Sequence, residues 1–187
     1  MARRSCHLLG EKEGWVVLKQ RGVSLIELMI GIALLAILLF VGVDSYRTWI
    51  QNTQVRTVAE AILNGMQLAR GEAVRRNVNV QMVLSGGTGW VVSVANTGEL
   101  IQSRTDGEGG KNAMLSVIPS GATTITFNGL GRVVANADAS PSIAQVEVSS
   151  SALADAETRK LQIRVGVGGD VRMCDPQLSP PDPRACS

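Results

Sequence analysis

The chain has 187 residues, of which 18 are lysine or arginine, 16 are aspartate or glutamate and one is histidine, so its formal net charge is +2. This near-neutral balance does not indicate a strongly basic nucleic-acid-binding protein. Because the single histidine, His7, lies near the amino terminus, no Ser-His-Asp or Cys-His catalytic group is expected in the rest of the chain. The length is sufficient for one globular domain and an anchoring segment.

Residues 1–22 form a basic segment that ends in Gly22. It contains five of the basic and two of the acidic residues, so 13 basic and 14 acidic residues remain after it. This positive excess predicts that the segment stays on the cytoplasmic side of a membrane. An apolar run of 21 residues, Val23–Val43, follows, in which only Ser24 and Glu27 are clearly polar. At about 1.5 Å per residue, the run matches the hydrocarbon thickness of a bilayer and predicts a transmembrane helix.

The junction between the two segments, Lys19-Gln20-Arg21-Gly22 before Val23 with an acid at Glu27, resembles the class III leader of type IV pilins and pseudopilins. The resemblance implies that prepilin peptidase cleaves between Gly22 and Val23 and methylates the new amino terminus at Val23. It also implies that Glu27 acts in assembly by meeting the amino terminus of a neighbouring subunit. An ordinary secretory signal would be cut after the apolar run, where the sequence is a poor match to a small-residue cleavage site.

The helix is predicted to continue through residues 44–76 as an amphipathic segment. Its apolar residues recur every three or four positions, which places them on one face. They are Val55, Val58, Ile62, Met66, Ala69 and Ala73. The sequence leaves open whether the helix bends near Asp44.

Residues 77–187 show the short alternating patterns and frequent turns that are typical of antiparallel sheets. Strands are predicted at Asn77–Leu84, Trp90–Val94, Met114–Ile118, Thr123–Phe127, Gln145–Val148, Leu161–Val165 and Val171–Cys174. The glycine-rich stretches 86–89 and 166–169 each lie between two strands, so they are predicted to be turns rather than phosphate-binding loops. The fold class is therefore α+β: a long N-terminal transmembrane and amphipathic helix packed on small antiparallel β-sheets.

Later motifs narrow the resemblance. The helix end Ala69–Asn77 and the turn Phe127–Arg132 resemble the GspH/FimT group of minor pilins and pseudopilins. The tail segments Arg172–Pro176 and Arg184–Cys186 resemble the cysteine-bearing FimT and FimU members of that group. The fold that this resemblance implies, a long helix on two small antiparallel sheets, agrees with the pattern of the residues.

The cysteines beyond the leader, Cys174 and Cys186, form an even pair in a segment expected to face the periplasm or the cell exterior. Disulfides persist in those compartments, so a bridge between the two is predicted, with two free thiols as the alternative. No zinc site is expected, because Cys6 and His7 lie in the leader and two thiols do not complete a four-ligand site. No metal or other cofactor is predicted.

Several charged groups are predicted to be solvated, namely the acidic pairs Asp106/Glu108 and Asp155/Glu157 and the helix-end cluster Arg70, Arg75 and Arg76. Cations near a helix carboxyl end are favoured by the helix dipole. Asp175 and Asp182 could hold a calcium ion together with backbone carbonyls, although an Asp-Pro pair more often marks a turn.

The sequence thus predicts a non-enzymatic minor pilin of the type IV pilus. It would be a single-pass protein of the bacterial inner membrane with a periplasmic C-terminal domain, and it would assemble with other pilins. One alternative is the GspH-type pseudopilin of type II secretion, which shares the anchor, fold and processing. Another is a FimT-like DNA receptor in natural transformation, for which the resemblance implies Arg164, Arg172 and Arg184 as DNA-binding residues. Nearby acids, including Asp170, oppose phosphate contacts.

Overall fold

The structure, a computed structural model, describes residues 23–186. The leader, residues 1–22, lies outside the described residues, and with it Gly22 on one side of the expected cleavage site. Contacts between residues divide the chain into two compact units, with the boundary between Val41 and Gly42.

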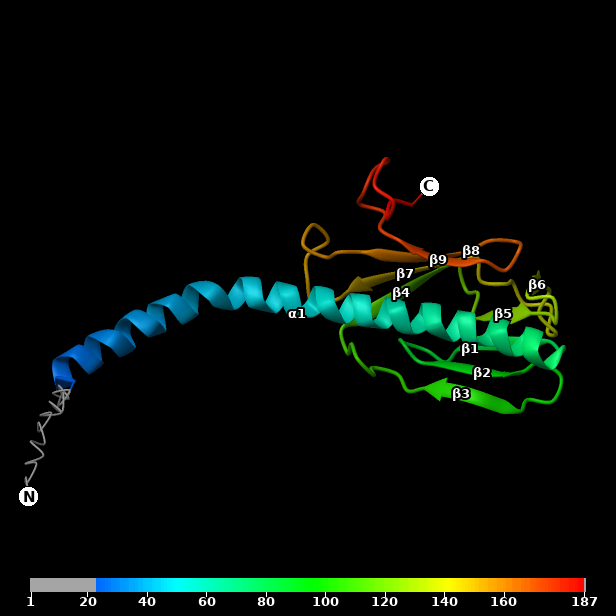
Figure 1. Cartoon of the computed structure of the whole chain (residues 1–187), viewed down its shortest axis with the longest axis horizontal. Coiled ribbons are helices and arrows are strands. Elements are labelled where there is room, and N and C mark those ends of the chain that lie inside the picture. The colour runs from blue at the N-terminus through cyan, green and yellow to red at the C-terminus, as the bar shows by residue number, and fades with distance from the viewer. Residues whose placement is uncertain (1–22, 187) are drawn as a thin grey trace, which may run out of the picture. The chain divides into compact units, whose positions relative to one another are not determined.

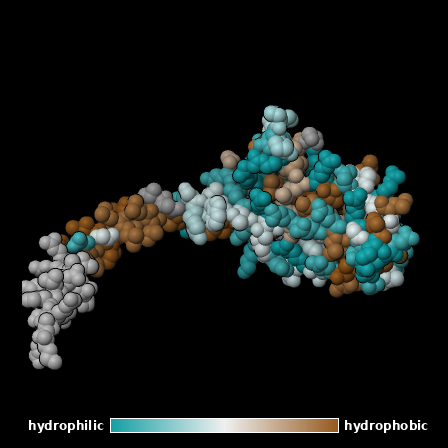
Figure 2. Space-filling view, viewed as in Figure 1, coloured by the Kyte–Doolittle hydropathy of each residue, from teal (hydrophilic) through white to brown (hydrophobic). Residues whose placement is uncertain are grey.

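Helix α1, Leu25–Arg76, begins within the apolar run. The large apolar side chains from Leu25 to Phe40 are all more than half exposed in the single chain, and Figure 2 shows hydrophobic residues concentrated along this part of the helix. Among residues 23–186, no single helix is long and apolar enough to cross a membrane by itself. The consecutive segments Leu25–Phe40 and Val43–Arg76 meet the length and composition requirement only in combination.

From Val55 onward, one face of α1 is buried against the sheets. The six residues of the predicted apolar stripe are at most 1% exposed, so the amphipathic helix is confirmed. The helix ends at Asn77, which has a positive φ of 51°. Asparagine tolerates this left-handed conformation, and the turn lets the amides of Asn77 and Val78 donate to the carbonyls of Val74 and Ala73 at 3.4 and 3.3 Å.

Two antiparallel sheets flank the second half of α1 (Figure 1). The first has the order β3-β2-β1-β5-β6, with β1 Val80–Leu84, β2 Trp90–Val94, β3 Leu100–Arg104, β5 Thr124–Phe127 and β6 Val133–Val134. The second has the order β4-β7-β8-β9, with β4 Ala113–Ile118, β7 Gln145–Ser150, β8 Leu161–Val165 and β9 Val171–Cys174. All seven predicted strands are present, and the α+β class is confirmed.

Strands β3 and β6 were not predicted. In β3 only Ile101 and Arg104 are partly buried, so the strand lacks the alternation of a half-buried sheet face. Strand β6 has two residues and pairs only with Thr126 and Phe127 of β5. Neither carries a periodic signal, because the positions of β3 do not alternate in burial and β6 is too short to show a period.

The glycine stretches form hairpin turns, as predicted. Between β1 and β2, Gly86 and Gly87 have positive φ values of 92° and 51°. Asp106 supports this turn, because its carboxylate accepts hydrogen bonds from the amide and hydroxyl of Thr88 at 2.6 and 3.2 Å. These bonds lower the pKa of Asp106, with the Thr88 amide contributing most. The prediction that Asp106 is merely solvated was therefore wrong.

The hydrophobic core lies between α1 and the inner faces of both sheets. Ile62 and Met66 of α1 pack with Met82 and Phe127 of the first sheet and Ile163 of the second, and all five are fully buried. Burying each such side chain contributes about 1.5–3 kcal/mol. This packing fixes β8, β9 and the tail that follows them against α1.

Candidate functional site

The amino-terminal part of the candidate site is the first turn of α1, which contains Glu27. Val23, the expected first residue after cleavage, is 68% exposed. Glu27 is also exposed, and among residues 23–186 it makes no hydrogen bond or ion pair. Its neighbours one turn along the helix, Ile30 and Gly31, are apolar. Within the described residues, the positive end of the helix dipole is what stabilises its charge locally.

The carboxyl-terminal part is the tail after β9. A disulfide joins Cys174 and Cys186, with 5.0 Å between their Cα atoms. Beside it, the amide of Asp175 donates to the carbonyl of Arg184 at 2.7 Å, and Asp175 pairs with Ala185 in a parallel bridge. The tail is therefore held along the end of β9 by a covalent bond and by main-chain contacts.

The two tail carboxylates are occupied by protein partners. Asp175 is 5% exposed; it accepts a hydrogen bond from the amide of Gln177 at 2.9 Å and lies 3.5 Å from Nε of Arg159. Asp182 pairs with Arg184 at 2.8 Å, and this pairing lowers the pKa of Asp182 to about 2. No three histidine, cysteine or acidic residues in the described part of the chain are placed to hold a metal ion.

The three arginines expected from the DNA-receptor alternative lie in two places. Arg164 of β8 and Arg172 of β9 are directly opposite each other in the ladder, both exposed. Arg164 donates from Nε to Gln145 at 3.3 Å, and Nε of Arg172 lies 3.4 Å from Asp170. Arg184 belongs to the tail and pairs with Asp182. The structure therefore brings two of the three together and neutralises part of their charge.

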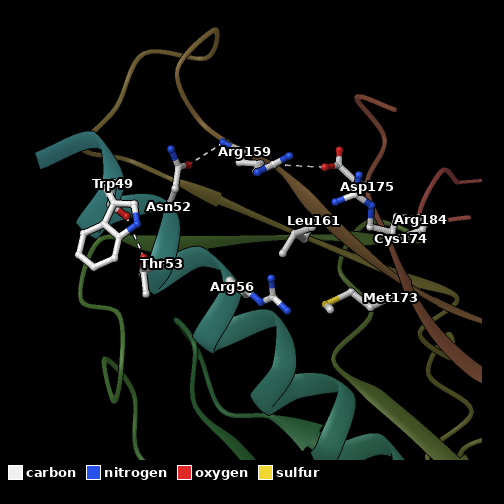
Figure 3. A pocket seen from close by; sticks show the side chains of 10 residues that line it. All are labelled: Trp49, Asn52, Thr53, Arg56, Arg159, Leu161, Met173, Cys174, Asp175 and Arg184. Carbon is white, nitrogen blue, oxygen red and sulfur yellow. Dashed lines mark hydrogen bonds and ion pairs between the residues drawn. The ribbon is translucent and has the colours of Figure 1, made fainter. Parts of the chain in front are cut away.

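A cleft of about 310 Å³ lies between α1 and the β8–β9 edge (Figure 3). One wall consists of α1 side chains, and Figure 3 shows Arg56 projecting from it toward Leu161 and Met173. Asn52 connects the walls, because it donates to the carbonyl of Glu157 at 3.0 Å and accepts from the amide of Arg159 at 2.7 Å. The full lining is Trp49, Asn52, Thr53, Arg56, Arg159, Leu161, Met173, Cys174, Asp175 and Arg184.

The sequence did not predict this cleft. The available signal was the spacing of Trp49, Asn52, Thr53 and Arg56, which places all four on one helical face. The opposite wall comes from residues more than a hundred positions away. The cleft contains three arginines and one buried aspartate among apolar side chains. This lining suits binding of a polar or anionic group better than catalysis.

Of the helix-end cations, Arg70 and Arg75 are exposed, as predicted, and Arg76 is half-buried, but all three also have protein partners that were not predicted. Arg75 and Arg76 both pair with Glu72, at 2.6 and 2.7 Å, and Arg76 also pairs with Glu99 at 2.8 Å. The side-chain hydrogen bonds of Arg75 and then Arg76 lower the pKa of Glu72 to about 2. Arg70 donates from Nε to the carbonyl of Gly131 at 3.0 Å, which ties α1 to the turn after β5.

The acidic pair Asp155/Glu157, which was predicted to be solvated, also makes contacts within the protein. Asp155 forms an ion pair with Lys160 at 2.7 Å, which raises the pKa of Lys160. The carbonyl of Glu157, as noted, accepts a bond from Asn52. These contacts fix the connection between β7 and β8 against the helix and so shape the cleft.

Comparisons with known proteins agree with this architecture. Residues 18–43 match the prokaryotic N-terminal methylation motif. Two crystal structures of the type IV minor pilin FimU from Pseudomonas aeruginosa (strain PAO1) are similar, each at 16% sequence identity. One covers 67% of this chain and 97% of FimU with a TM-score of 0.48; the other covers 68% and 92% with a TM-score of 0.51. The similarity to the structure with the TM-score of 0.51 supports the arrangement of the helix and the two sheets described above.

No curated protein matches the chain in a sequence comparison. The family model described as type II transport protein GspH, however, matches residues 58–169. That range begins within the buried face of α1 and ends in the β8–β9 turn, so it includes the core and most of both sheets. The chain therefore belongs to the GspH family and has an N-terminal methylation motif in front of its family domain.

Proposed function

We propose that the protein is a minor pilin of a type IV pilus, a structural and non-enzymatic subunit. In this proposal it spans the bacterial inner membrane once with its domain in the periplasm. Prepilin peptidase cleaves it between Gly22 and Val23 and methylates Val23, and it then assembles with other pilins. The observation that carries the proposal is the methylation motif, which includes the exposed apolar start of α1, a helix whose later residues belong to the core of the domain.

The exposed apolar surface of α1 explains why the subunit would be found first in a lipid bilayer and then in a filament. Between Leu25 and Phe40 the large apolar side chains are more than half exposed within the described part of the chain. Lipid covers them before assembly, and the helices of neighbouring subunits cover them in a filament. Glu27 is the one acid on this surface, and an opposite charge nearby makes such a carboxylate tolerable. The amine that cleavage would create at Val23 of an adjacent subunit supplies that charge and sets the register.

The experiment that tests the proposal is mass analysis of two fractions from a piliated bacterium that makes the chain. Membrane-bound protein should have lost residues 1–22 and gained a methyl group, and sheared pili should contain peptides from residues 44–187. In a strain without prepilin peptidase, the full-length chain should stay in the membrane. A mature amino terminus beyond Val43 would reject the proposal in favour of an ordinary secretory signal.

A second candidate is a pseudopilin of type II secretion, and the description of the matching family model favours it. Both candidates need the same anchor and processing, so the discriminating experiment is a deletion of the chain. Loss of surface pili with normal enzyme secretion supports the minor pilin. Loss of secretion with normal pili supports the pseudopilin.

A third candidate is a DNA receptor, and the observation in its favour is the position of Arg164 opposite Arg172. We favour the structural role over the DNA-receptor role, because Asp170 pairs with Arg172 and Asp182 pairs with Arg184.

A further inference from the structure

We propose that Tyr46 and Trp49, together with Arg47 between them, form an interfacial collar that seats α1 at the headgroup layer of a phospholipid bilayer and sets how deeply the helix is immersed. The proposal rests on the membrane-anchored function given above and adds a specific lipid-contacting surface to it.

The aromatic residues are distributed unequally along the described chain. Trp90 and Phe127 are in the core, at 4% and 0% exposure. The remaining three, Phe40, Tyr46 and Trp49, lie within ten positions of one another and are 85%, 62% and 63% exposed. Large aromatic side chains lose most by contact with water. Their exposure within one short stretch of the sequence therefore indicates a segment that another phase covers.

Tyr46 and Trp49 also form a defined unit. They are three residues apart in α1, and their rings stack with centroids 6.0 Å apart and an interplanar angle of 29°. Each ring combines an apolar body with one polar group, the Tyr46 hydroxyl and the Trp49 indole N–H. This combination is the one that favours the boundary between acyl chains and headgroups.

The position along the helix fits the same boundary. Tyr46 and Trp49 come three and six positions after Val43, the last residue of the apolar run, which corresponds to about 5 and 9 Å of helix. The headgroup layer on each side of a bilayer is about 5–8 Å thick. Helical side chains lean toward the amino terminus, which brings both rings back toward the apolar run. Arg47 then lies at the level of the lipid phosphates.

Trp49 also lines the cleft that contains Arg56, and Figure 3 shows its ring at one end of that cleft. A protein contact is therefore the competing explanation for its exposure. The continuity of the aromatic residues with the apolar run favours lipid, because nothing in the cleft requires Phe40 and Tyr46 to be exposed as well.

The experiment uses tryptophan emission of the full chain in phospholipid vesicles, with bromine on the lipid acyl chains either close to the headgroup or close to the chain end. All proteins carry Trp15→Phe, so that only Trp49 and Trp90 emit. Vesicle flotation is measured first. We expect shallow bromine to remove most of the Trp49 emission, deep bromine to remove less, and the Trp49→Phe variant, which retains buried Trp90, to be insensitive to both.

Each other outcome overturns a specific statement. If bromine quenches the emission of the vesicle-bound protein no more than that of Trp49→Phe, the collar does not exist. Tyr46 and Trp49 would then be assigned to a contact with another protein. Stronger quenching by deep bromine would show that the pair does not mark the interface. A chain that does not float with the vesicles would instead reject membrane anchoring, and with it the proposed function.

Discussion

At the scale of single residues, Glu27 is unusual because its charge has no partner among residues 23–186, whereas most other described acids are hydrogen-bonded or paired. We predict that Glu27→Gln leaves the domain folded and membrane insertion intact or improved, since it removes a charge that costs about 2.5–3.5 kcal/mol in lipid. Incorporation into pili should fall sharply, because the registering charge is lost. The measurement is the ratio of protein in sheared pili to protein in membranes.

Glu60→Gln is the matched control, because Glu60 is also on α1 but pairs with Arg56 at the surface, at 2.8 Å. Such pairs contribute little to stability, so this variant should be incorporated normally. If Glu27→Gln were incorporated as well as Glu60→Gln at equal expression, Glu27 would have no registering role.

Glu72 allows a prediction about pH. Its pKa is lowered from 4.5 to about 2 by Arg75 and Arg76. A lowered pKa contributes stability that is present above pH 4.5 and is lost as pH falls toward 2. We therefore expect the free energy of unfolding of the unit beginning at Gly42 to fall over this window, and the stability difference between wild type and Glu72→Gln to shrink in parallel. Urea unfolding at stepped pH measures both quantities; a difference independent of pH would contradict the assignment.

At the scale of elements, the tail after β9 depends on its disulfide. Cys174 and Cys186 are 12 positions apart, and closing a loop of this size stabilises the folded state by about 3 kcal/mol in the chain-entropy description. We predict that the double variant Cys174→Ser/Cys186→Ser loses about that much in urea unfolding while retaining its core. A reducing agent should lower the stability of the wild type by a similar amount and leave the variant unchanged. Equal stability of all these forms would remove the tail as a stabilising element.

Whether a helix or strand could be predicted from the sequence depended on how clearly its local pattern appears there. Strands β2, β8 and β9 have the predicted bounds, because each is a short run that contains valine or isoleucine and is followed or preceded by turn residues. Strand β3 escaped prediction because its exposed and half-buried positions do not alternate, and β6 because it has only two residues. The cleft escaped for another reason: Trp49, Arg159 and Arg184 meet only through tertiary packing, and no local pattern relates them. The pair of Arg76 with Glu99 was missed in the same way, whereas the pairs of Arg75 and Arg76 with Glu72 lie within one helical turn and could have been predicted.

At the scale of the whole molecule, charge limits what the domain can bind. Beyond the leader the acidic and basic residues nearly balance, and Arg172 and Arg184 have acidic partners. We predict weak binding of duplex DNA by the unit beginning at Gly42 at near-physiological salt, because a few phosphate contacts lose affinity steeply as salt rises. Fluorescence anisotropy with a labelled duplex over a salt series measures this.

The DNA-receptor candidate makes the opposite prediction. Tight binding near physiological salt, abolished by Arg172→Ala or Arg184→Ala without unfolding, would replace the structural role. Arg56→Ala is the matched control, because it removes an arginine of α1 that belongs to neither the β8–β9 ladder nor the tail.

The way the tail lies against β9 has a consequence for the solubility of the protein. Strand β9 is at the edge of its sheet, so alternate main-chain groups point away from β8. Next to this edge, the tail pairs with Asp175, the residue that follows β9, through the bond to Arg184 and the bridge to Ala185. Uncovered strand edges recruit strands of other chains. Protein made where thiols remain reduced lacks the covalent bond that holds the tail at the end of β9, so we expect it to aggregate more readily. The yield of monomer should then depend on the redox state of the compartment that produces it.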